Sequence, residues 1–370
     1  MILILVYLII FSYLIYIIWI TEPIFFKTQY KKIKYNPNIS IIISARNEQN
    51  NIHKLLDGLI SQSYPKNKYE IIIANDRSTD NTLEILKSYK EKINNFSIID
   101  IKNTKKNWSS KKWALNQCIK KTNNEIILQT DADCIHNQYW VESMVNEFHN
   151  ENTGFIAGPS YIGMKNNFIN DLLKIESLSQ ESFTYANSKR QLYISCTGRN
   201  IAYRKTVFDE VGGYKDISHI NSGDDDLLLH KIATKTKWNI KFLANPKALV
   251  TSYIPSSIKS FYMQRLRYAS KGLIYYDLST PNEVKIILPF IYIANFMCVI
   301  SIFNFIITNS ILWTIPLLLK SIPEIILISK YMSKLKLNFK LLHFMFLVIL
   351  HPLYVILLGG LAPFMSVQWK

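Results

Sequence analysis

The sequence of 370 residues has few cysteines and no glycine-rich phosphate loop. Its four cysteines, Cys118, Cys134, Cys196 and Cys298, show no paired spacing, so we expect neither a zinc site nor a disulfide framework. The turn after the first apolar strand, residues 44–48, lacks a G-x-G-x-x-G pattern, and no G-x-x-x-x-G-K-[ST] occurs. These absences argue against a dinucleotide-binding Rossmann domain and a Walker-type loop. A phosphorylated ligand would have to be held by a metal ion and by side chains.

Acidic residues are scarce relative to basic ones: 27 Asp and Glu accompany 43 Lys and Arg, which gives a formal net charge of +16. Basic chains bind nucleic acid, anionic lipid or phosphorylated small molecules. Many of the basic residues flank apolar runs, at 27–34 and 330–340, and this placement is typical of the cytoplasmic side of a membrane. Because no basic helix or stacking motif accompanies the charge, nucleic acid is not an expected partner.

Long apolar runs occupy both ends of the sequence. Residues 2–20 are uncharged and about long enough to cross a bilayer. They lack the basic start and the small-residue cleavage site of a signal peptide, so residues 1–22 are predicted to be a retained transmembrane anchor. Residues 284–370 are predicted to add about three passes, at about 286–308, 311–328 and 341–362.

The pass at 311–328 is the least regular, because it contains Lys320 and Glu324. These side chains can pair across one helical turn, and the segment is either a full pass or a kinked, re-entrant helix. The resulting expectation is an integral protein of a bacterial-type inner or cell membrane. The basic flanks place the region between the anchor and the C-terminal passes in the cytoplasm.

The region between the apolar ends has a different pattern. Short β-branched strands, predicted at 39–45, 69–74, 97–101 and 126–130, alternate with amphipathic helices. This alternation implies right-handed crossovers and a parallel sheet. Residues 154–220 are less regular, apart from a strand predicted at 198–204. The predicted fold class is therefore α/β, a mostly parallel sheet flanked by helices at 38–250, with N-terminal and C-terminal transmembrane helices.

Two carboxylates one residue apart, Asp131 and Asp133, follow the strand at 126–130. Ligands of open α/β sheets bind beyond the carboxyl ends of the strands, and two acids this close repel each other unless a cation lies between them. A divalent ion held by one or two carboxylates and by substrate phosphates fits this arrangement. The alternative is a solvated turn at the end of a strand.

A second acidic cluster, Asp224, Asp225 and Asp226, begins an amphipathic helix after Gly223. Acids in a first helical turn suit the helix dipole, and capping is one explanation of the cluster. Three adjacent carboxylates exceed what a cap requires, and their mutual repulsion favours a raised pKa in one of them, towards the range of a general base.

A mixture of aromatic and basic residues at helical spacing follows at 260–268. Residues 251–283 are predicted to be helices lying flat at the headgroup interface. An ordinary surface helix is the alternative interpretation.

These pieces form an ordered series that resembles the family 2 glycosyltransferases of the GT-A fold, and in particular their membrane-bound, synthase-like members. The resemblance covers roughly residues 38–272. The motifs that carry it are I-I-S-A-R-N-E at 42–48 (the opening strand and its R-N-E turn), A-N-D-R-S-T-D at 74–80 (D-D-x-S-x-D), K-K-W-A-L-N at 111–116 (G-K-x-x-A-L-N), D-A-D at 131–133 (D-x-D), G-R-N-I-A at 198–202 (G-x-N-x-A), G-D-D-D at 223–226 (an E-D pair) and Q-R-L-R-Y at 264–268 (Q-x-x-R-W).

The resemblance implies a donor pocket. Asp76 matches the acid that reads the base of a sugar nucleotide, and Arg46 and Glu48 line the same pocket. Lys112 is expected near the pyrophosphate, and Asp131 on the ribose side. The family's first acid of the D-D pair is replaced by Asn75, but the second acid is the one that contacts the base.

The resemblance also implies the metal and acceptor sides of the site. Asp133 matches the metal ligand, with Asp131 as a second candidate, and Mg²⁺ or Mn²⁺ is the expected ion. Gly198 and Asn200 match the acceptor-side motif. Three residues are expected to close over the diphosphate and the acceptor at the membrane surface: Gln264, Arg267 and Tyr268.

Some positions depart from the family pattern. Ser110 replaces the Gly before the Lys, and Tyr268 replaces Trp with a smaller aromatic face. The E-D pair aligns in two ways: Asp225 is the base if Asp224 stands for the Glu, and Asp224 is the base if Gly223 does. Both assignments stay open at this stage, with a preference for Asp225.

The expected function is an inverting, metal-dependent transfer of a sugar. The donor is a nucleotide-sugar, with a UDP-sugar expected, and the acceptor is a lipid or a polysaccharide at the membrane. Such a transfer has three requirements. A cation neutralises the charge of the leaving diphosphate, a carboxylate takes the proton of the acceptor hydroxyl, and positive groups hold the pyrophosphate. The alternatives are a non-catalytic membrane scaffold on a degenerate transferase fold and a nucleotidyltransferase, which would release pyrophosphate instead of a nucleoside diphosphate.

Overall fold

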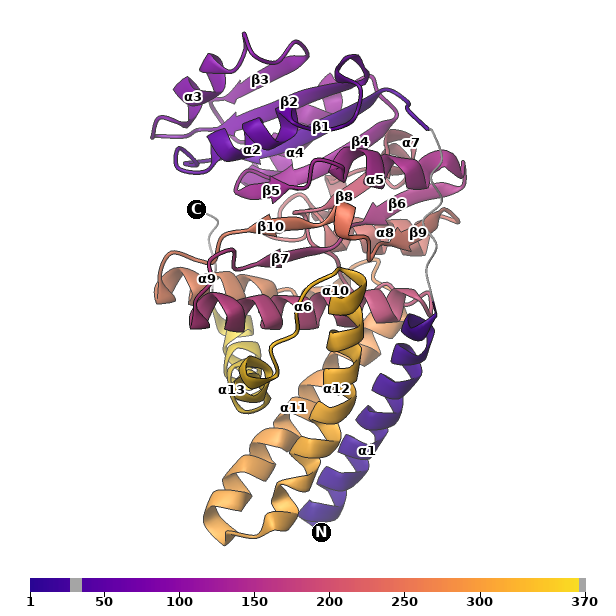
Figure 1. Ribbon diagram of the computed structural model, residues 1–370, viewed down its shortest axis with the longest axis vertical. Helices are drawn as coiled ribbons and strands as arrows, with labels where there is room; N and C mark the ends of the chain where they lie inside the picture. The colour runs from indigo at the N-terminus through magenta and orange to yellow at the C-terminus, as the bar shows by residue number, and fades with distance from the viewer. Residues whose placement is uncertain (27–34, 366–370) are drawn as a thin grey trace. The chain divides into compact units, whose positions relative to one another are not determined.

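The computed structural model describes residues 1–26 and 35–365, and the chain divides into two compact units (Figure 1). The sheet unit comprises residues 35–161 and 195–253. The helical unit comprises residues 1–26, 162–194 and 254–365. The chain therefore enters the helical unit three times, and each unit is described by itself. The domain bounds expected from the sequence stay a prediction.

Among the described residues, the sheet unit holds a seven-stranded sheet in the order β3-β2-β1-β4-β8-β6-β9. The strands are β1 Ile39–Ala45, β2 Tyr69–Asp76, β3 Phe96–Ile101, β4 Ile126–Asp131, β6 Thr153–Ala157, β8 Ile201–Arg204 and β9 Asn239–Phe242. β1 pairs in parallel with β2 and β4, β2 with β3, and β6 with β9, whereas β8 runs antiparallel to β4 and β6. The predicted, mostly parallel α/β sheet is confirmed.

A three-stranded sheet and six α-helices also belong to this unit. The small sheet has the order β5-β10-β7, with strands β5 Cys134–His136, β10 Val250–Ser252 and β7 Ser160–Ile162. The helices are α2 Ile52–Ile60, α3 Thr82–Ser88, α4 Ser110–Lys121, α5 Trp140–Val145, α7 Lys205–Glu210 and α8 Asp226–Lys235. The strand predicted at 198–204 is shorter than expected, because residues 198–200 form a turn before β8 begins.

The register of the central strands brings the predicted site residues to one edge of the sheet. Consecutive residues of β1 are buried on both faces, as expected for a parallel strand covered by helices. Ala45 at the end of β1 lies opposite Asn75, and Ser44 lies opposite Asp131. The carboxyl ends of β1, β2 and β4 are therefore level, and the residues that follow them share one edge.

The helical unit contains four helices that are long and apolar enough to cross a membrane, among the residues the structure describes. These segments are Ile2–Phe25, Asn282–Thr308, Ile311–Lys334 and Leu341–Leu361. Within them lie α1 Ile2–Thr21, α11 Asn282–Thr308, α12 Ile315–Lys334 and α13 Leu341–Leu361. They coincide with the apolar runs predicted at 2–20, 286–308, 311–328 and 341–362. The basic segment 27–34 lies outside the described residues.

The irregular pass is a continuous helix. α12 runs through Pro323, and Lys320 Nζ lies 2.7 Å from Glu324 Oε1, one turn further along the helix. The hydroxyl of Tyr13 on α1 donates a hydrogen bond of 2.5 Å to the same carboxylate oxygen. The internal pair expected from the sequence is thus formed, and it is joined by a partner from α1.

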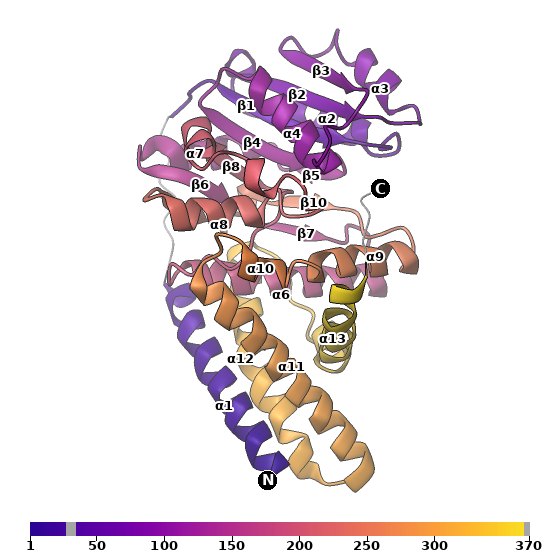
Figure 2. The same ribbon diagram turned by 180° about the vertical axis from the view of Figure 1, so that it is seen from behind.

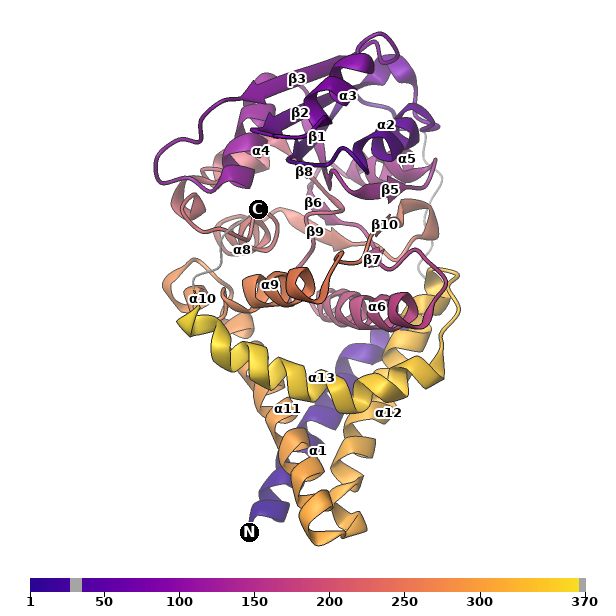
Figure 3. The same ribbon diagram turned by 90° about the vertical axis from the view of Figure 1, so that its left-hand side faces the viewer.

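The segment 154–220 also contains a helix that the sequence pattern did not reveal. α6 spans Phe168–Ser188, is capped by the side chain of Asn167, and lies beside α9, which spans Ile258–Ala269 (Figures 2 and 3). A short helix, α10 Ile274–Asp277, follows α9. α6 buries Glu176, and a charge on the inner face hides the apolar periodicity from which helices are predicted.

Candidate active site

Two turns at the carboxyl ends of β1 and β2 hold each other in place. Asn47 Oδ1 accepts a hydrogen bond of 2.9 Å from Thr79 N, and Glu48 N donates one of 2.8 Å to Thr82 Oγ1. Asn47 and Arg77 have left-handed backbone angles, with φ of 55° and 54°. Strained residues of this kind persist where surrounding contacts fix them, and they are common at ligand-binding sites.

The predicted donor-pocket residues lie on and beside these turns. Arg46 Nε is buried and has no hydrogen-bond partner among the described residues. Asp76 is buried at the end of β2 and accepts a hydrogen bond of 2.8 Å from Arg77 Nε. Arg77 Nη2 also donates to Ser110 Oγ at 2.6 Å. Arg77 and Ser110 therefore fix the position of the Asp76 carboxylate, a function that the sequence reasoning did not assign to either residue.

The remaining pocket residues have protein partners as well. Glu48 Oε2 accepts a hydrogen bond of 3.0 Å from Asn51 Nδ2. Asn75 Nδ2 donates to Asp100 Oδ1 at 2.8 Å. An aspartate at position 75 would bring a second carboxylate against Asp100, and the two would repel each other. The departure from the family's D-D pair is thus explained by the neighbouring strand β3.

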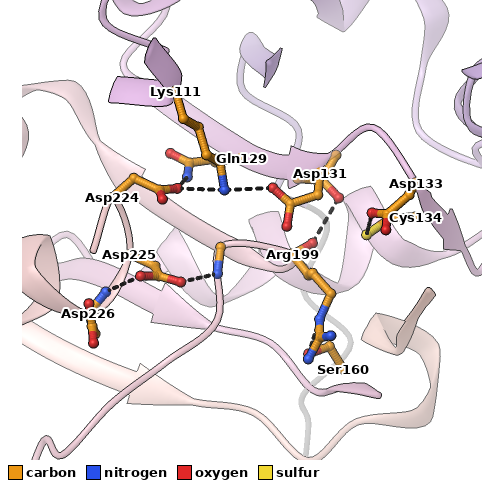
Figure 4. A network of polar contacts seen from close by, with 12 residues as sticks. Lys111, Gln129, Asp131, Asp133, Cys134, Ser160, Arg199, Asp224, Asp225 and Asp226 are labelled. Carbon is orange, nitrogen blue, oxygen red and sulfur yellow. Dashed lines mark hydrogen bonds and ion pairs between the residues drawn. The ribbon is translucent and has the colours of Figure 1, made fainter. Parts of the chain in front are cut away.

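A buried lysine joins the two acidic clusters (Figure 4). Lys111, in the first turn of α4, places Nζ 2.8 Å from Asp131 Oδ1 and 3.0 Å from Asp224 Oδ2. Gln129 on β4 donates a further hydrogen bond of 2.9 Å to Asp224 Oδ2. The acid at the end of β4 and the acidic turn before α8 therefore converge on one cation, although about ninety residues separate them in the sequence.

The charges in this cluster set one another's protonation. Burial by itself raises the pKa of Asp224, but Lys111 and Lys112 outweigh it, and the pKa lies below its usual value. Burial likewise lowers the pKa of Lys111, but Asp131 and Asp224 outweigh it, and that pKa is raised. Lys111 and Asp224 are therefore both ionised at neutral pH.

Asp225 is held in a different way from its neighbours. Its Oδ2 accepts a hydrogen bond of 2.7 Å from Gly198 N, and its Oδ1 accepts one of 2.7 Å from Asp226 N. Its side chain is half-buried, whereas Asp224 and Asp226 are buried. Asp225 is also the N-cap of α8. It therefore caps this helix, as one explanation of the acidic residues proposed, and it is also a member of the cluster.

Gly198 lies at the centre of these groups. A Cβ added at this position would lie 3.0 Å from Asp224 Oδ2 and 3.4 Å from both Asp225 Oδ2 and Lys111 Nζ. Any larger residue would push into the space between the lysine and the two carboxylates. The glycine of the predicted acceptor-side motif therefore keeps the cluster compact.

Two residues that the resemblance placed near substrate are engaged with the protein instead. Lys112 is buried, and its Nζ donates hydrogen bonds of 2.6 Å to the carbonyl oxygens of Ile220 and Ser222, which hold the acidic turn against α4. Asn200 is fully buried; its amide nitrogen donates to two backbone carbonyls, and its Oδ1 accepts a bond of 2.8 Å from Trp140 Nε1. Lys112 and Asn200 therefore hold the backbone around the site in place through hydrogen bonds to other protein groups.

Lys111 is the cation that the sequence reasoning did not select. The spacing of the motif G-K-x-x-A-L-N could have identified it. Ser110 occupies the position of the Gly, Lys111 follows it directly, and Ala114 comes three residues after Lys111, as the motif requires. The direct ligand role of Lys112 stays a prediction, and the geometry favours its neighbour.

Asp133 lies on the turn between β4 and β5, apart from the lysine cluster and next to Cys134 (Figure 4). Cys134 Sγ lies 3.8 Å from Asp133 Oδ1. Within residues 1–26 and 35–365, no group of three or more His, Cys, Asp or Glu side chains is arranged to hold a metal ion. A site of this kind fits Mg²⁺ or Mn²⁺ only if the ligand brings most of the donors, as substrate phosphates do for Mg²⁺. Asp131 already faces Lys111.

The last group of predicted residues belongs to the helical unit. Gln264, Arg267 and Tyr268 lie on α9. The guanidinium of Arg267 is 5.5 Å from the centre of the Tyr268 ring, and Gln264 Oε1 is buried without a hydrogen-bond partner among the described residues. Their approach to the sheet unit stays a prediction.

The mostly parallel sheet, flanked by helices and with acids at its strand ends, agrees with the GT-A fold that the sequence resembles. Residues 40–212 match the sequence profile described as glycosyl transferase family 2. This match covers a little under half of the chain and identifies residues 40–212 as a domain of the family 2 glycosyltransferase type.

Curated relatives agree with this assignment. The probable glycosyltransferase YdaM of Bacillus subtilis (strain 168) is 26% identical over 65% of this chain and 56% of its own length. A poly-beta-1,6-N-acetyl-D-glucosamine synthase of Staphylococcus epidermidis is 28% identical over 66% of this chain and 56% of its own. The match therefore spans a little over half the length of these relatives.

A solved structure shows the same fold along almost the entire chain. It is the mannosyltransferase PcManGT from Pyrobaculum calidifontis, in complex with GDP-Man and Mn²⁺. The TM-score is 0.61 at 16% identity, and the alignment covers 98% of each chain. At this level of identity the likeness establishes the fold, and the substrates of that enzyme are its own.

Proposed function

We propose that this chain is a glycosyltransferase that moves a sugar from a nucleotide-sugar to a lipid or polysaccharide acceptor at a membrane, with inversion at the transferred carbon and with the help of Mg²⁺ or Mn²⁺. The observation that carries the proposal is the contact of Lys111 with both Asp131 and Asp224. This contact joins Asp131, at the end of β4, to the acidic turn before α8, which would supply the general base.

Asp225 is the base in this proposal. Asp224 is buried, and its charge is neutralised by Lys111, so it is a poor proton acceptor. Asp225 is more exposed, and the Gly198 N–H fixes its orientation. A single base that removes the proton of the acceptor hydroxyl, opposite the leaving group, gives inversion in one displacement, by the logic that applies to inverting glycosidases.

The donor would lie along the carboxyl ends of β1, β2 and β4. Asp76 is positioned by Arg77 to accept a hydrogen bond from a nucleobase, and the buried Arg46 Nε is available to a ligand beside it. Lys111 would hold the diphosphate, because a buried cation that remains protonated stabilises developing negative charge. A UDP-sugar is the donor we propose to test first.

Asp133 is the side chain proposed to hold the metal ion, and Asp131 is retained for the ribose and for Lys111. When bound, the ion neutralises charge on the departing diphosphate. The carboxylate oxygen of Asp133 is a hard donor, as both ions prefer, but one carboxylate binds such an ion weakly by itself. We therefore expect the metal to bind together with the nucleotide.

The acceptor and the location follow from the apolar helices. Four segments are long and apolar enough to span a membrane. Lys330 and Lys334 lie in the last two turns of α12, and Lys336 and Lys340 follow it. Such basic residues favour the cytoplasmic side. Sugar nucleotides would then reach the sheet unit from the cytoplasm, and Gln264, Arg267 and Tyr268 would act at the lipid surface. The polysaccharide synthase among the relatives supports a glycan acceptor as one of the two candidates.

The decisive experiment replaces Asp225 with Asn in the full chain. Membranes carrying each variant are incubated with labelled UDP- and GDP-sugars, and lipid and polymer products are extracted separately. Loss of a general base costs about 10²- to 10⁴-fold in turnover, while binding of the nucleotide is expected to change little. Asp209→Asn, at an exposed position of α7, is the matched control and should keep full activity.

The same assay separates the alternatives. Release of pyrophosphate instead of a nucleoside diphosphate would identify a nucleotidyltransferase. Undiminished function of a chain in which Asp224, Asp225 and Asp226 are all replaced would identify a non-catalytic scaffold. If Asp225→Asn is fully active and Asp224→Asn is not, the base assignment moves to Asp224.

A further inference from the structure

The last helix, α13, has an apolar stripe along its whole length. It contains no Asp, Glu, Lys or Arg, and by length and composition alone it qualifies as a membrane span. Its exposed large apolar residues form two rows in which neighbours are four or seven positions apart, which places them on one broad face. They are Leu341, Leu342, Met345, Phe346, Ile349, Leu350, Leu357 and Leu361.

The other face of α13 is attached to two helices that are too polar to lie in hydrocarbon. α6 carries Asp171 and Glu176 within its length, and α9 carries Arg265 and Arg267; neither is among the candidate spans of the described chain. Figure 3 shows α6 and α9 side by side, with α13 passing beneath both. We call α6 and α9 together the polar layer.

The contacts with the polar layer extend from one end of α13 to the other. At the start, Lys340 Nζ lies 2.6 Å from Asp171 Oδ2 on α6. At the end, Leu358 and Ala362 pack against Leu266 on α9. These contacts are about 30 Å apart along the helix at 1.5 Å per residue. That is about the thickness of the hydrocarbon core of a bilayer.

A helix that crosses the bilayer can meet a surface layer with only one of its ends. α13 meets the polar layer with both ends and also in between, where the Tyr354 hydroxyl donates a hydrogen bond of 2.6 Å to Glu176 Oε1. The axis of α13 is therefore parallel to the polar layer. Figure 3 accordingly shows α13 running across the direction of α1, α11 and α12.

The contact with α11 agrees with a shallow position. Tyr292 OH donates a hydrogen bond of 3.2 Å to the carbonyl of Ile356, and a Cβ on Gly359 would lie 2.6 Å from the Tyr292 ring. α11 has 27 residues, roughly 40 Å, which is longer than the hydrocarbon core. Its first turns, with Glu283 and Lys285, therefore extend beyond the core, and Tyr292 lies near the interface, where tyrosines are enriched.

We propose that α13 lies in the plane of the membrane surface, with its apolar stripe in lipid, and that the described chain crosses the bilayer three times, through α1, α11 and α12. The occupant of the stripe is lipid hydrocarbon, because α13 packs against α11, a candidate span that exposes apolar side chains of its own, among them Ile286 and Ile293. The lysines that precede α13 suit anionic headgroups at the same level. Residues on both sides of α13 then lie on the same side of the membrane as the chain between α1 and α11, in whose described residues no candidate span occurs.

Single cysteines test the number of crossings. The four native cysteines are buried, so the unmodified full chain serves as the labelling background. Met365→Cys follows α13, Lys90→Cys is exposed on the sheet unit, and Ser310→Cys lies between α11 and α12. With a membrane-impermeant maleimide on intact and permeabilised cells, Met365→Cys and Lys90→Cys should label alike, and Ser310→Cys in the opposite way. Labelling of Met365→Cys together with Ser310→Cys would overturn the proposal.

Depth measurements supply a second test. A fluorophore is attached to Phe346→Cys, Ile349→Cys or Leu357→Cys in vesicles whose lipids carry nitroxides at known depths. A helix in the plane gives the same shallow depth at all three positions. A spanning helix separates the outer two by about 16 Å, and a stripe covered by a second copy of the chain is not quenched by lipid; either result refutes the proposal. Neither readout uses catalysis, so failure here leaves the proposed function untouched.

Discussion

Lys111 and Lys112, at the start of α4, make different contacts. Lys111 faces the two carboxylates of the cluster, whereas the Lys112 ammonium is bonded to backbone carbonyls of the acidic turn. Consecutive residues of a helix point in directions about 100° apart, so a motif that contains two lysines can place only one of them in the site. The motif identifies the helix, and the packing of the helix selects the residue.

We expect Lys111→Met to weaken binding of a nucleoside diphosphate at least about tenfold, or 1.4 kcal/mol, because the cation nearest the strand ends is lost. Calorimetric titration of the purified full chain with UDP and GDP measures the effect. Lys112→Met is the comparison, and it should lower thermal stability with a smaller change in nucleotide affinity. Weaker binding in Lys112→Met alone would restore Lys112 as the diphosphate ligand.

The lowered pKa of Asp224 predicts a pH dependence of stability. A carboxyl group whose pKa is depressed by folding contributes stability above its unfolded pKa, about 3.9, and the contribution is lost as the pH falls through the folded pKa. Asp224→Asn should therefore lower the melting temperature at pH 7 and weaken its fall below about pH 4.

Thermal melts of the full chain between pH 7 and pH 3, followed by tryptophan fluorescence, measure this effect. Asp209→Asn changes an exposed carboxylate of the same unit and should keep the wild-type profile. An Asp224→Asn variant with the full acid dependence of the wild type would show that other groups control acid unfolding.

At the scale of elements, the sequence was informative where burial is uniform. β1 and β4 are buried almost throughout, and their bounds were predicted to within one residue; the apolar spans are equally clear. α6 was missed because its inner face carries Glu176, whose charge is balanced by Arg265 from a segment about ninety residues away. The family resemblance assigned Asp131 and the acidic turn at 223–226 to one active site, but the lysine between Asp131 and Asp224 could be selected only from the packing of α4.

The pair Glu176–Arg265 yields a prediction about the polar layer. Arg265 Nη2 lies 2.5 Å from Glu176 Oε2, and both side chains are buried. Glu176→Gln leaves the guanidinium without a counter-charge, and breaking a buried pair in this way costs about 3–5 kcal/mol. We expect a clearly lower melting temperature, measured on the detergent-purified chain.

A double-mutant cycle isolates the pair. Adding Arg265→Gln to Glu176→Gln removes the unpaired charge and should recover part of the loss, giving a coupling energy within the 0.5–3 kcal/mol typical of contacting residues. Additive effects of the two changes would mean that the ion pair contributes nothing to the contact between α6 and α9.

At the scale of the whole molecule, segments from three parts of the sequence build the helical unit. The Tyr16 hydroxyl on α1 donates a hydrogen bond of 2.6 Å to Asn187 Oδ1 on α6, and Arg190 Nη2 donates one of 2.7 Å to the carbonyl of Trp19. α1 thus contacts a segment inserted into the middle of the sheet unit's sequence. It is a structural part of the helical unit as well as an anchor.

Deletion of residues 2–21 should therefore destabilise the chain without releasing it from the membrane. α11 and α12 remain, so the deleted chain should stay in the membrane fraction after a carbonate wash. It loses the Tyr13 contact with Glu324 and the Tyr16 contact with Asn187, each worth about 1 kcal/mol, together with the packing of α1. The melting temperature in detergent should fall by about 5 °C or more.

Tyr13→Phe, which removes one hydroxyl and keeps the helix, is the control. Its melting temperature should fall by less than half as much as that of the deleted chain. Recovery of the deleted chain in the soluble fraction would show that α11 and α12 do not hold it in the membrane, and an unchanged melting temperature would reduce α1 to a tether.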